Sequence, residues 1–253
     1  CYPAILVIGQ FMDALHSGKY DINRTALIIT QTGGGCRASN YIHMLRKALH
    51  RAGMDQVPVI SLNLSGLESN PGFQIDLDMI RKLLAGVVYG DTLMCLNNQI
   101  KPYEIQKGQS EALLNTWTDR LNDQLNHGHG IGMSAQKKNL RLILHDFAQI
   151  PIKKVPKVHV GIVGEIYVKY AAFANNHLED FLAEQDCEVN VPGLMNFLIF
   201  MVGHSLDDIH LYGGNPAKLI LVKALFQYVT AMQHTITNAF KPYPQFLAPT
   251  EFA

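Results

Sequence analysis

The stretch TALIITQTGGGCRASNYIHMLRKALHRAGMDQVPVISL, residues 25–62, predicts the fold of the first third of the chain. One end, residues 25–30, is a short apolar run that suits a strand covered on both faces, and the other end, residues 57–62, is the second predicted strand. Between them lie three consecutive glycines and a segment, residues 40–52, whose apolar positions repeat at helical spacing. A strand, a glycine loop, a helix and a second strand form a βαβ unit with parallel strands. We therefore expect an α/β lobe over residues 1–75.

A second α/β pattern follows a helical stretch. Residues 76–150 carry apolar residues at helical spacing and no convincing strand, so we expect them to form a helical connecting segment whose first helix covers residues 76–90. Beyond them, residues 158–164 and 187–192 are strand-like and flank a helical segment at residues 175–185. This order predicts a second βαβ unit in an α/β lobe over residues 151–253, which ends in helices. The predicted fold class is therefore α/β, with parallel sheets in two lobes.

Composition and charge exclude several classes of protein. The 253 residues include 21 Lys and Arg against 21 Asp and Glu, so the net charge is zero. Proteins that bind nucleic acids electrostatically carry a basic excess, and we therefore expect no nucleic-acid partner. The longest apolar run of the second half, residues 194–202, falls far short of the roughly 20 residues of a membrane span, so we expect no membrane partner and a cytoplasmic location. Because the sequence begins with Cys1 rather than Met, we expect a fragment of a longer chain or a processed product.

The loop between the first strand and the helix that follows it is the first candidate site. Gly33, Gly34 and Gly35 allow a tight turn and leave N–H groups beside a helix N-terminus, which suits an anion or a cofactor. No Gly-Lys-Ser/Thr follows, which excludes a Walker loop, and the glycines lack the spacing of a dinucleotide fingerprint. Cys36 and Arg37 end the loop, where a cation and a helix N-terminus favour the thiolate that a metal ligand or a nucleophile requires. The alternative is a tight turn in which Cys36 is a small apolar residue.

The four cysteines are too few for a disulfide scaffold of this size, and they divide into two pairs. Cys1 precedes the first predicted helix, and Cys36 lies at the carboxyl-end rim of the predicted sheet, where ligands gather in α/β folds. Two cysteines on loops at that rim can share an iron–sulfur cluster, although no Cys-x-x-Cys spacing is present. Cys95 lies in an apolar run and Cys187 starts a predicted strand, so we expect both to be packing residues.

A second candidate site follows the first strand of the second lobe. Residues 164–169 occupy the same topological place as the glycine loop of the first lobe, and Asn175 follows on the next helical segment. Contact with a ligand is one interpretation of these residues. In the other interpretation Asn175 caps the following helix, and Glu165 pairs with Lys169.

Three segments carry a resemblance to a known family: CYPA at residues 1–4, QTGGGCRASNY at residues 31–41 and GIVGEIYVK at residues 161–169. With these segments the sequence resembles the C-terminal region of the large CoA-substrate-specific activase-related proteins. That family is related to the activator and dehydratase components of 2-hydroxyacyl-CoA dehydratases, including 2-hydroxyglutaryl-CoA dehydratase. The similarity covers most of the chain, and the long glycine–cysteine segment is specific.

The resemblance implies two flavodoxin-like lobes and an iron–sulfur cluster of the [4Fe–4S] type. Cys1 and Cys36 match the family's cysteine positions, which makes them the expected cluster ligands. The three glycines of the loop would let the backbone approach the cluster, and Arg37 would offset its charge. A cubane takes four ligands, or three and an open position, so further ligands would come from Cys187, from upstream sequence or from a partner.

The same resemblance implies a function. The wider family uses ATP hydrolysis in an actin-like domain to drive low-potential electrons into an iron–sulfur protein. The expected function is therefore an iron–sulfur electron-transfer or dehydratase-like domain of an ATP-driven 2-hydroxyacyl-CoA dehydratase activase-type system. The sequence shows no phosphate-binding signature of the ATPase, so the expected partners are the ATPase portion of the same longer chain and a dehydratase or an acyl-CoA. The alternative is a non-catalytic scaffold or docking domain that positions the ATPase part against a partner dehydratase.

Overall fold

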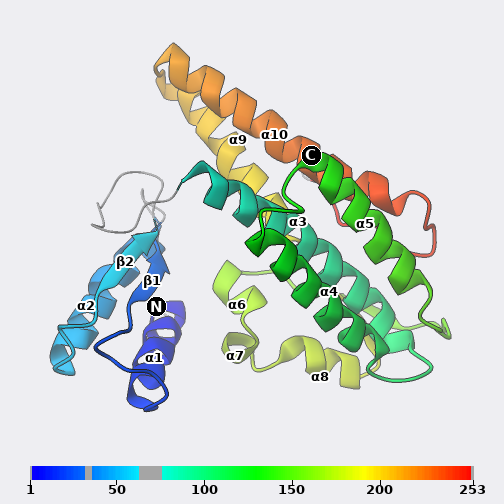
Figure 1. The fold of residues 1–253 in the computed structure, drawn as a ribbon, viewed down its shortest axis with the longest axis horizontal. Coiled ribbons are helices and arrows are strands. Elements are labelled where there is room, and N and C mark those ends of the chain that lie inside the picture. Colours follow the sequence, from blue (N-terminus) through cyan, green and yellow to red (C-terminus); the bar gives the residue numbers. More distant parts are fainter. Residues whose placement is uncertain (1, 32–35, 63–75, 252–253) are drawn as a thin grey trace. The chain divides into compact units, whose positions relative to one another are not determined.

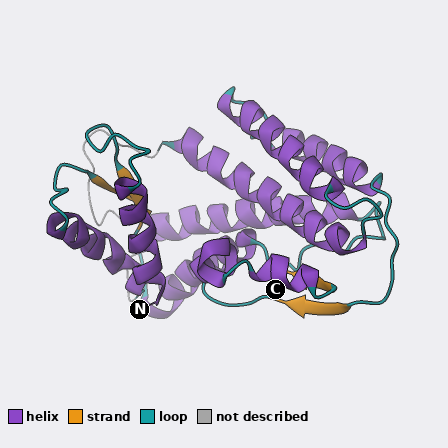
Figure 2. Cartoon of the chain, turned by 90° about the horizontal axis from the view of Figure 1, so that it is seen from below, coloured by secondary structure: helices purple, strands orange, loops and turns teal. Residues whose placement is uncertain are grey.

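The structure, a computed structural model, describes residues 2–31, 36–62 and 76–251 of the chain (Figure 1). These residues form a mixed α/β fold that is mainly helical and contains two small parallel sheets (Figure 2). The chain divides into two compact units, Cys1–Asp76 and Leu77–Ala253. Among the described residues, no helix combines the length and the apolar character that crossing a membrane requires.

The first unit contains the βαβ arrangement that the sequence predicts. Strands β1 and β2 are parallel and pair in register from Leu27 with Val59 to Thr30 with Leu62. The elements of the unit, in chain order, are α1 (Tyr2–His16), β1 (Leu27–Thr30), the 3₁₀ helix η1 (Arg37–Asn40), α2 (Tyr41–Arg51) and β2 (Val59–Leu62). Because a parallel pair needs a crossover connection, the helical segment between the strands fixes this topology.

The core of the first unit lies on one face of its sheet. Ile42, Leu45 and Leu49 of α2 are buried at helical spacing, and they join a cluster with Leu27 and Ile29 of β1. The intervening β1 residues are exposed, so the expectation of a strand covered on both faces was wrong. The physical reason is that α1 and α2 contact each other and contribute to the same apolar cluster, which covers a single face.

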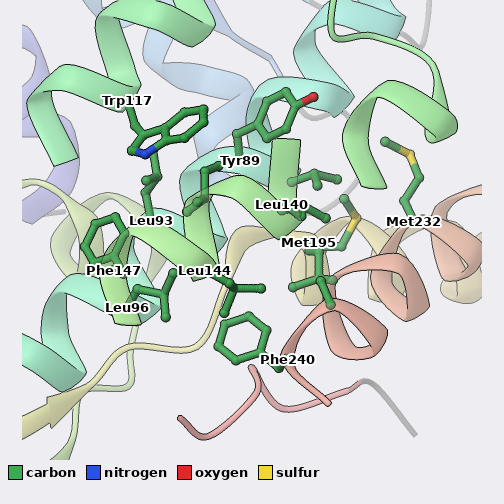
Figure 3. Packing of buried hydrophobic residues seen from close by; sticks show 14 of the residues in the cluster. Tyr89, Leu93, Leu96, Trp117, Leu140, Leu144, Phe147, Met195, Met232 and Phe240 are labelled. Atoms are coloured by element: carbon green, nitrogen blue, oxygen red, sulfur yellow. The ribbon is translucent and has the colours of Figure 1, made fainter. Parts of the chain in front are cut away.

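Five long helices build the second unit. They are α3 (Leu77–Ile100), α4 (Gln109–Asn126), α5 (Met133–Ala148), α9 (Leu194–Tyr212) and α10 (Pro216–Phe240). Their buried side chains form one cluster, part of which Figure 3 shows, with Trp117, Leu144, Phe147, Met195 and Phe240 among its members. The helices of the predicted connecting segment therefore share a core with the C-terminal helices.

Helix α3 extends ten residues beyond the end that the sequence predicts. We expected a helix over residues 76–90 that ends at a glycine, but the helix continues through Gly90 to Ile100. Leu93, Leu96 and Ile100 are buried in the core of the unit. Their burial outweighs the cost of about 1 kcal/mol that one glycine imposes on a helix.

The second sheet lies in the second unit. It pairs β3 (Val158–Gly161) with β4 (Cys187–Asn190) in parallel, with Val158 opposite Cys187 and Gly161 opposite Asn190. Three short helices connect the strands: α6 (Ile166–Tyr170), α7 (Ala172–Asn175) and α8 (Leu178–Glu184). We expected one helix over residues 175–185, and the break arises because Asn176 and His177 adopt left-handed backbone conformations that a helix does not contain.

Candidate functional site

A buried polar network lies at the carboxyl end of the first sheet. Gln31 follows β1 and is 7% exposed, and Ser61 of β2 is 2% exposed. The Ser61 hydroxyl donates to Gln31 Oε1 over 2.7 Å, and Gln31 Nε2 donates to the carbonyl oxygen of Ser39 over 3.1 Å. The backbone N–H of Gln31 donates to Leu62 O over 3.1 Å. One glutamine side chain therefore ties both strand ends to η1, where the glycine–cysteine segment ends.

Cys36 lies on this rim as an exposed, free thiol. Its backbone is extended, with φ −73° and ψ 132°, and it immediately precedes η1. The Cys36 carbonyl accepts a hydrogen bond from the N–H of Ser39 over 3.2 Å, which starts the 3₁₀ turn. Arg37 is the first residue of η1 and is exposed as well. The thiol is thus accessible, and the Ser39 residue that bonds the Cys36 carbonyl is itself bonded by the Gln31 side chain.

The other residues predicted for this site, Cys1, Gly33, Gly34 and Gly35, lie outside the described residues. The pairing of Cys1 with Cys36 therefore stays a prediction. In the described part of the chain, no three His, Cys, Asp or Glu side chains come together as a metal site.

Cys95 and Cys187 occupy different surroundings. Cys95 is half-buried on α3, where its sulfur lies 3.1 Å from Gln99 Nε2 and 3.6 Å from Leu247 O. Burial raises the pKa of the Cys95 thiol to about 12, so the reactive thiolate form is strongly disfavoured. Cys187 begins β4, at the opposite end of the strand from the carboxyl rim, and its sulfur lies 3.6 Å from Gln185 O. The contacts of Cys95 agree with the packing role expected for it, whereas Cys187 is partly exposed and its packing role stays a prediction.

The second candidate segment is occupied by helix-capping contacts. Glu165 accepts a hydrogen bond from the N–H of Val168 over 3.0 Å and so caps α6, instead of pairing with Lys169. The Lys169 ammonium lies 3.4 Å from the Pro192 carbonyl oxygen. Asn175 Oδ1 accepts from the N–H of Leu178, the first residue of α8, which confirms the capping interpretation of Asn175. These polar side chains hold the loops of the second sheet in place.

A buried carboxylate fixes the start of α9 beside the second sheet. Asp91 of α3 accepts hydrogen bonds from the backbone N–H groups of Leu194 and Met195, each over 2.8 Å. Burial raises the pKa of Asp91, and the two N–H bonds oppose that shift. A Cβ on Gly193 would lie 2.5 Å from Asp91 Oδ2, so only glycine fits there. The sequence analysis did not identify Asp91, although an acidic residue inside an apolar helical stretch is a usable signal.

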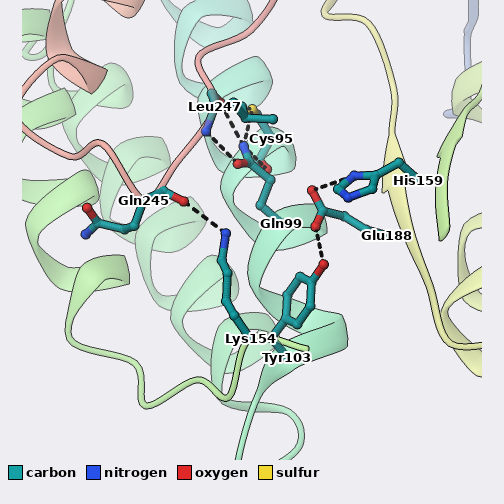
Figure 4. Close-up of polar contacts among 8 residues, drawn as sticks. All are labelled: Cys95, Gln99, Tyr103, Lys154, His159, Glu188, Gln245 and Leu247. Carbon is teal, nitrogen blue, oxygen red and sulfur yellow. Dashed lines mark hydrogen bonds and ion pairs between the residues drawn. The ribbon is translucent and has the colours of Figure 1, made fainter. Parts of the chain in front are cut away.

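Figure 4 shows a further polar cluster in the second unit that the sequence analysis missed. The Tyr103 hydroxyl donates to Glu188 Oε2 over 2.6 Å, and His159 Nδ1 lies 3.5 Å from Glu188 Oε1. Burial and the neighbouring Glu188 carboxylate raise the pKa of Tyr103 to about 12. Tyr103 and Glu188 are 85 positions apart in the sequence, so only the fold brings them together.

Comparisons of the chain with protein-family models, with curated proteins and with solved structures gave no match. The described residues offer one exposed thiol at a sheet's carboxyl end, next to a 3₁₀ helix that the buried Gln31 amide bonds. Such a thiol can ligate a soft metal centre or act as a nucleophile.

Proposed function

We propose that the chain is an iron–sulfur electron-transfer or dehydratase-like domain of an ATP-driven 2-hydroxyacyl-CoA dehydratase activase-type system, acting in the cytoplasm. The observation that carries the proposal is the exposed, free Cys36 on the loop that follows β1. Parallel α/β sheets gather ligands at their carboxyl ends, and Cys36 lies at that end of its sheet. Two flavodoxin-like lobes, of which β1–β2 and β3–β4 would be the central strands, belong to the same proposal.

In this proposal the cluster binds on the loop that contains Cys36. Cys36 would hold it together with Cys1, and further ligands would come from Cys187, from upstream sequence or from a partner. A bound cluster supplies one-electron transfer, which an acyl-CoA thioester needs in order to form a ketyl-type radical. Arg37, exposed beside the thiol, would offset the negative charge of a thiolate-ligated cluster. Gln31 would act as a positioning residue, because it holds η1 against the sheet.

Anaerobic reconstitution with iron and sulfide tests the proposal. The reconstituted chain should be brown, with broad visible absorption and bound iron. Cys36→Ser should remove the colour, because an alcohol is a poor ligand for the cluster. Cys95→Ser is the matched control and should keep the colour, since Cys95 is engaged with Gln99 and Leu247. A chain that takes up no iron, or a Cys36→Ser variant as brown as the parent, would contradict the proposal.

The second candidate function is docking, in which the chain positions the ATPase portion against a partner dehydratase. It is favoured by α9 and α10, which lie side by side (Figure 1). Both helices carry large apolar side chains that are exposed. These side chains are Phe200, Met201, Leu211, Tyr212, Ile220, Leu221 and Leu225. Exposed apolar surface of this extent is typical of protein interfaces.

Binding to purified 2-hydroxyglutaryl-CoA dehydratase tests the docking function. Under docking, the double change Leu211→Gln and Tyr212→Gln should weaken binding at least tenfold, because two of the most exposed apolar side chains are lost. Leu83→Gln on α3 is the control, since Leu83 is also exposed but lies on another helix. Equal binding by all three proteins would exclude docking through this surface, whatever the outcome of the iron experiment.

A further inference from the structure

A cavity of about 170 Å³ lies within the second unit, between α3, the β3–β4 sheet and the chain at residues 247–249. The side-chain amide of Gln99 fixes one wall of the cavity through two hydrogen bonds, one donated and one accepted. Gln99 Nε2 donates to Leu247 O over 2.8 Å, and Leu247 N donates to Gln99 Oε1 over 2.7 Å (Figure 4). The Lys154 ammonium adds a hydrogen bond of 3.1 Å to Gln245 O. The C-terminal segment is therefore held in place as a wall of the cavity.

Glu188 lines this cavity, and its acceptor capacity is incompletely used. Its side chain is only 8% exposed. One oxygen accepts from Tyr103, while the other lies 3.5 Å from His159 Nδ1, which is longer than an ordinary hydrogen bond. A carboxylate offers about four acceptor positions, and leaving a buried charge without donors is costly. A ligand that brings N–H donors to Glu188 would therefore be stabilised.

The charges around the cavity favour a cation. Asp91 and Glu188 both act on Cys95, a residue of the cavity wall, and their negative charges add to the effect of burial in raising the pKa of that thiol. The nearby ammonium groups are engaged elsewhere. Lys157 pairs with Asp186 and Lys154 bonds Gln245, and both ammonium groups also lie over the Tyr103 ring. Among the described residues, Tyr103 and His159 are the titratable side chains that contact Glu188 directly.

The rest of the lining determines the shape of a ligand. Leu247, Ala248 and Pro249 form an apolar side of the cavity, together with Val191 of the segment after β4. The volume corresponds to about five or six water-sized groups. A short alkyl chain fits these dimensions, with its polar end at Glu188 and its carbon atoms against the C-terminal segment.

We propose that this cavity binds a small primary alkylammonium ion, whose N–H groups donate to Glu188 and whose alkyl chain packs against Leu247, Ala248 and Pro249. The site is separate from the cysteine loop, because all of its residues belong to the second unit. The proposal therefore does not depend on the iron–sulfur function.

Titration of the full chain with n-butylammonium chloride, followed by NMR of the His159 ring and the Ala248 methyl group, tests the proposal. We expect saturable shifts of both signals with a Kd of about 1 mM, as a ligand of five heavy atoms allows. 1-Butanol, a neutral molecule of the same size, should bind at least about tenfold more weakly because it lacks the charge. Equal binding of the amine and the alcohol, or shifts that never saturate, would overturn the proposal.

Two variants locate the binding site. Glu188→Gln should weaken n-butylammonium binding at least about tenfold, while its amide oxygen still accepts the Tyr103 hydrogen bond. Glu184→Gln, which changes an exposed carboxylate of α8, should bind like the parent.

Should Glu188→Gln fail to fold, Gly161→Val serves instead. The register places Gly161 on the sheet face that His159 and Glu188 share, and an added Cβ meets no atom within 4 Å. This variant should fill the cavity and abolish binding; unchanged binding in a folded variant would contradict the proposal.

Discussion

The two parallel sheets have the same size and the same topology, yet their carboxyl ends are used differently. In the first unit, the polar side chains at the strand ends are buried and support a loop that presents an exposed thiol, Cys36. In the second unit, the segments that follow the strands are held by helix caps: Glu165, after β3, caps α6, and Asp91 of α3 caps α9, which follows β4. Identical strand topology therefore leaves one rim available for chemistry and uses the other to hold the framework.

Because of this difference, the proposed ligand site of the second unit is a cavity and not a strand-end loop. Its cavity lies against the sheet face that carries Glu188, beside the C-terminal segment. The strand-end loops near it are already hydrogen-bonded to their own helices. Four predictions test how far the two units differ, beginning with the largest expected effect.

The first prediction is that each unit depends on its own core. Phe147→Ala removes a fully buried ring from the second unit and should lower its stability by about 3–5 kcal/mol. Trp117 is the single tryptophan of the chain and lies in the same core, so its fluorescence during urea unfolding measures this loss selectively. Leu45→Ala, in the core of the first unit, should leave the Trp117 transition unchanged. An equal shift in both variants would show that the units unfold as one.

The second prediction concerns the start of α9. Gly193→Ala places a methyl group 2.5 Å from Asp91 Oδ2 and should destabilise the second unit by about 1–3 kcal/mol, because the cap must move. Gly203→Ala is the control on the same helix. Its Cβ would lie at an ordinary 3.4 Å from Phe226, so its effect should be within about 0.5 kcal/mol or stabilising. Equal urea midpoints for the two variants would show that the contact with Asp91 is unimportant.

The third prediction tests the hydrogen bonds through which Gln31 joins the first sheet to η1. Ser61→Ala removes the hydroxyl that donates to Gln31 and leaves a buried amide oxygen without that donor, which should cost about 1–2 kcal/mol. Faster hydrogen exchange of the β1 and α2 amides would measure this loss, while the Trp117 transition stays unchanged. Ser17→Ala removes an exposed hydroxyl of the same unit and should alter exchange much less. If the hydrogen-exchange protection of these amides were unchanged in Ser61→Ala, the positioning role of Gln31 would be contradicted.

The fourth and smallest effect is a dependence of stability on pH in the second unit. The hydrogen bond from Lys101 lowers the pKa of Asp180 below its ordinary value of 3.8. The stability that this pair contributes is therefore present above pH 3.8 and is lost as the pH falls through the lower pKa of the folded state. Because both side chains are partly exposed, Asp180→Asn should cost less than about 1 kcal/mol at pH 7. The difference from the parent, followed by Trp117 fluorescence, should shrink in acid; a difference that grows below pH 3.8 would contradict the assignment.

Local patterns in the sequence were sufficient for much of the fold. The apolar runs at Leu27–Thr30 and Val59–Leu62 and the helical spacing of Ile42, Leu45 and Leu49 predicted the first βαβ unit. The second parallel pair was predicted in the same way. The spacing of apolar residues did not predict where helices end or break. The length of α3 depends on which distant helices bury Leu96 and Ile100, and no local pattern contains that information.

For the candidate site, the sequence singled out the loop and its cysteine, because glycines, a thiol and a cation adjoin in the chain itself. The tertiary structure alone decided what supports that loop and where a further cavity lies. Gln31 meets Ser61 across 30 positions, and Glu188 meets Tyr103 across 85. The physical reason is that covalent neighbours set local conformation, whereas burial and hydrogen-bond partners arise only when distant segments pack together.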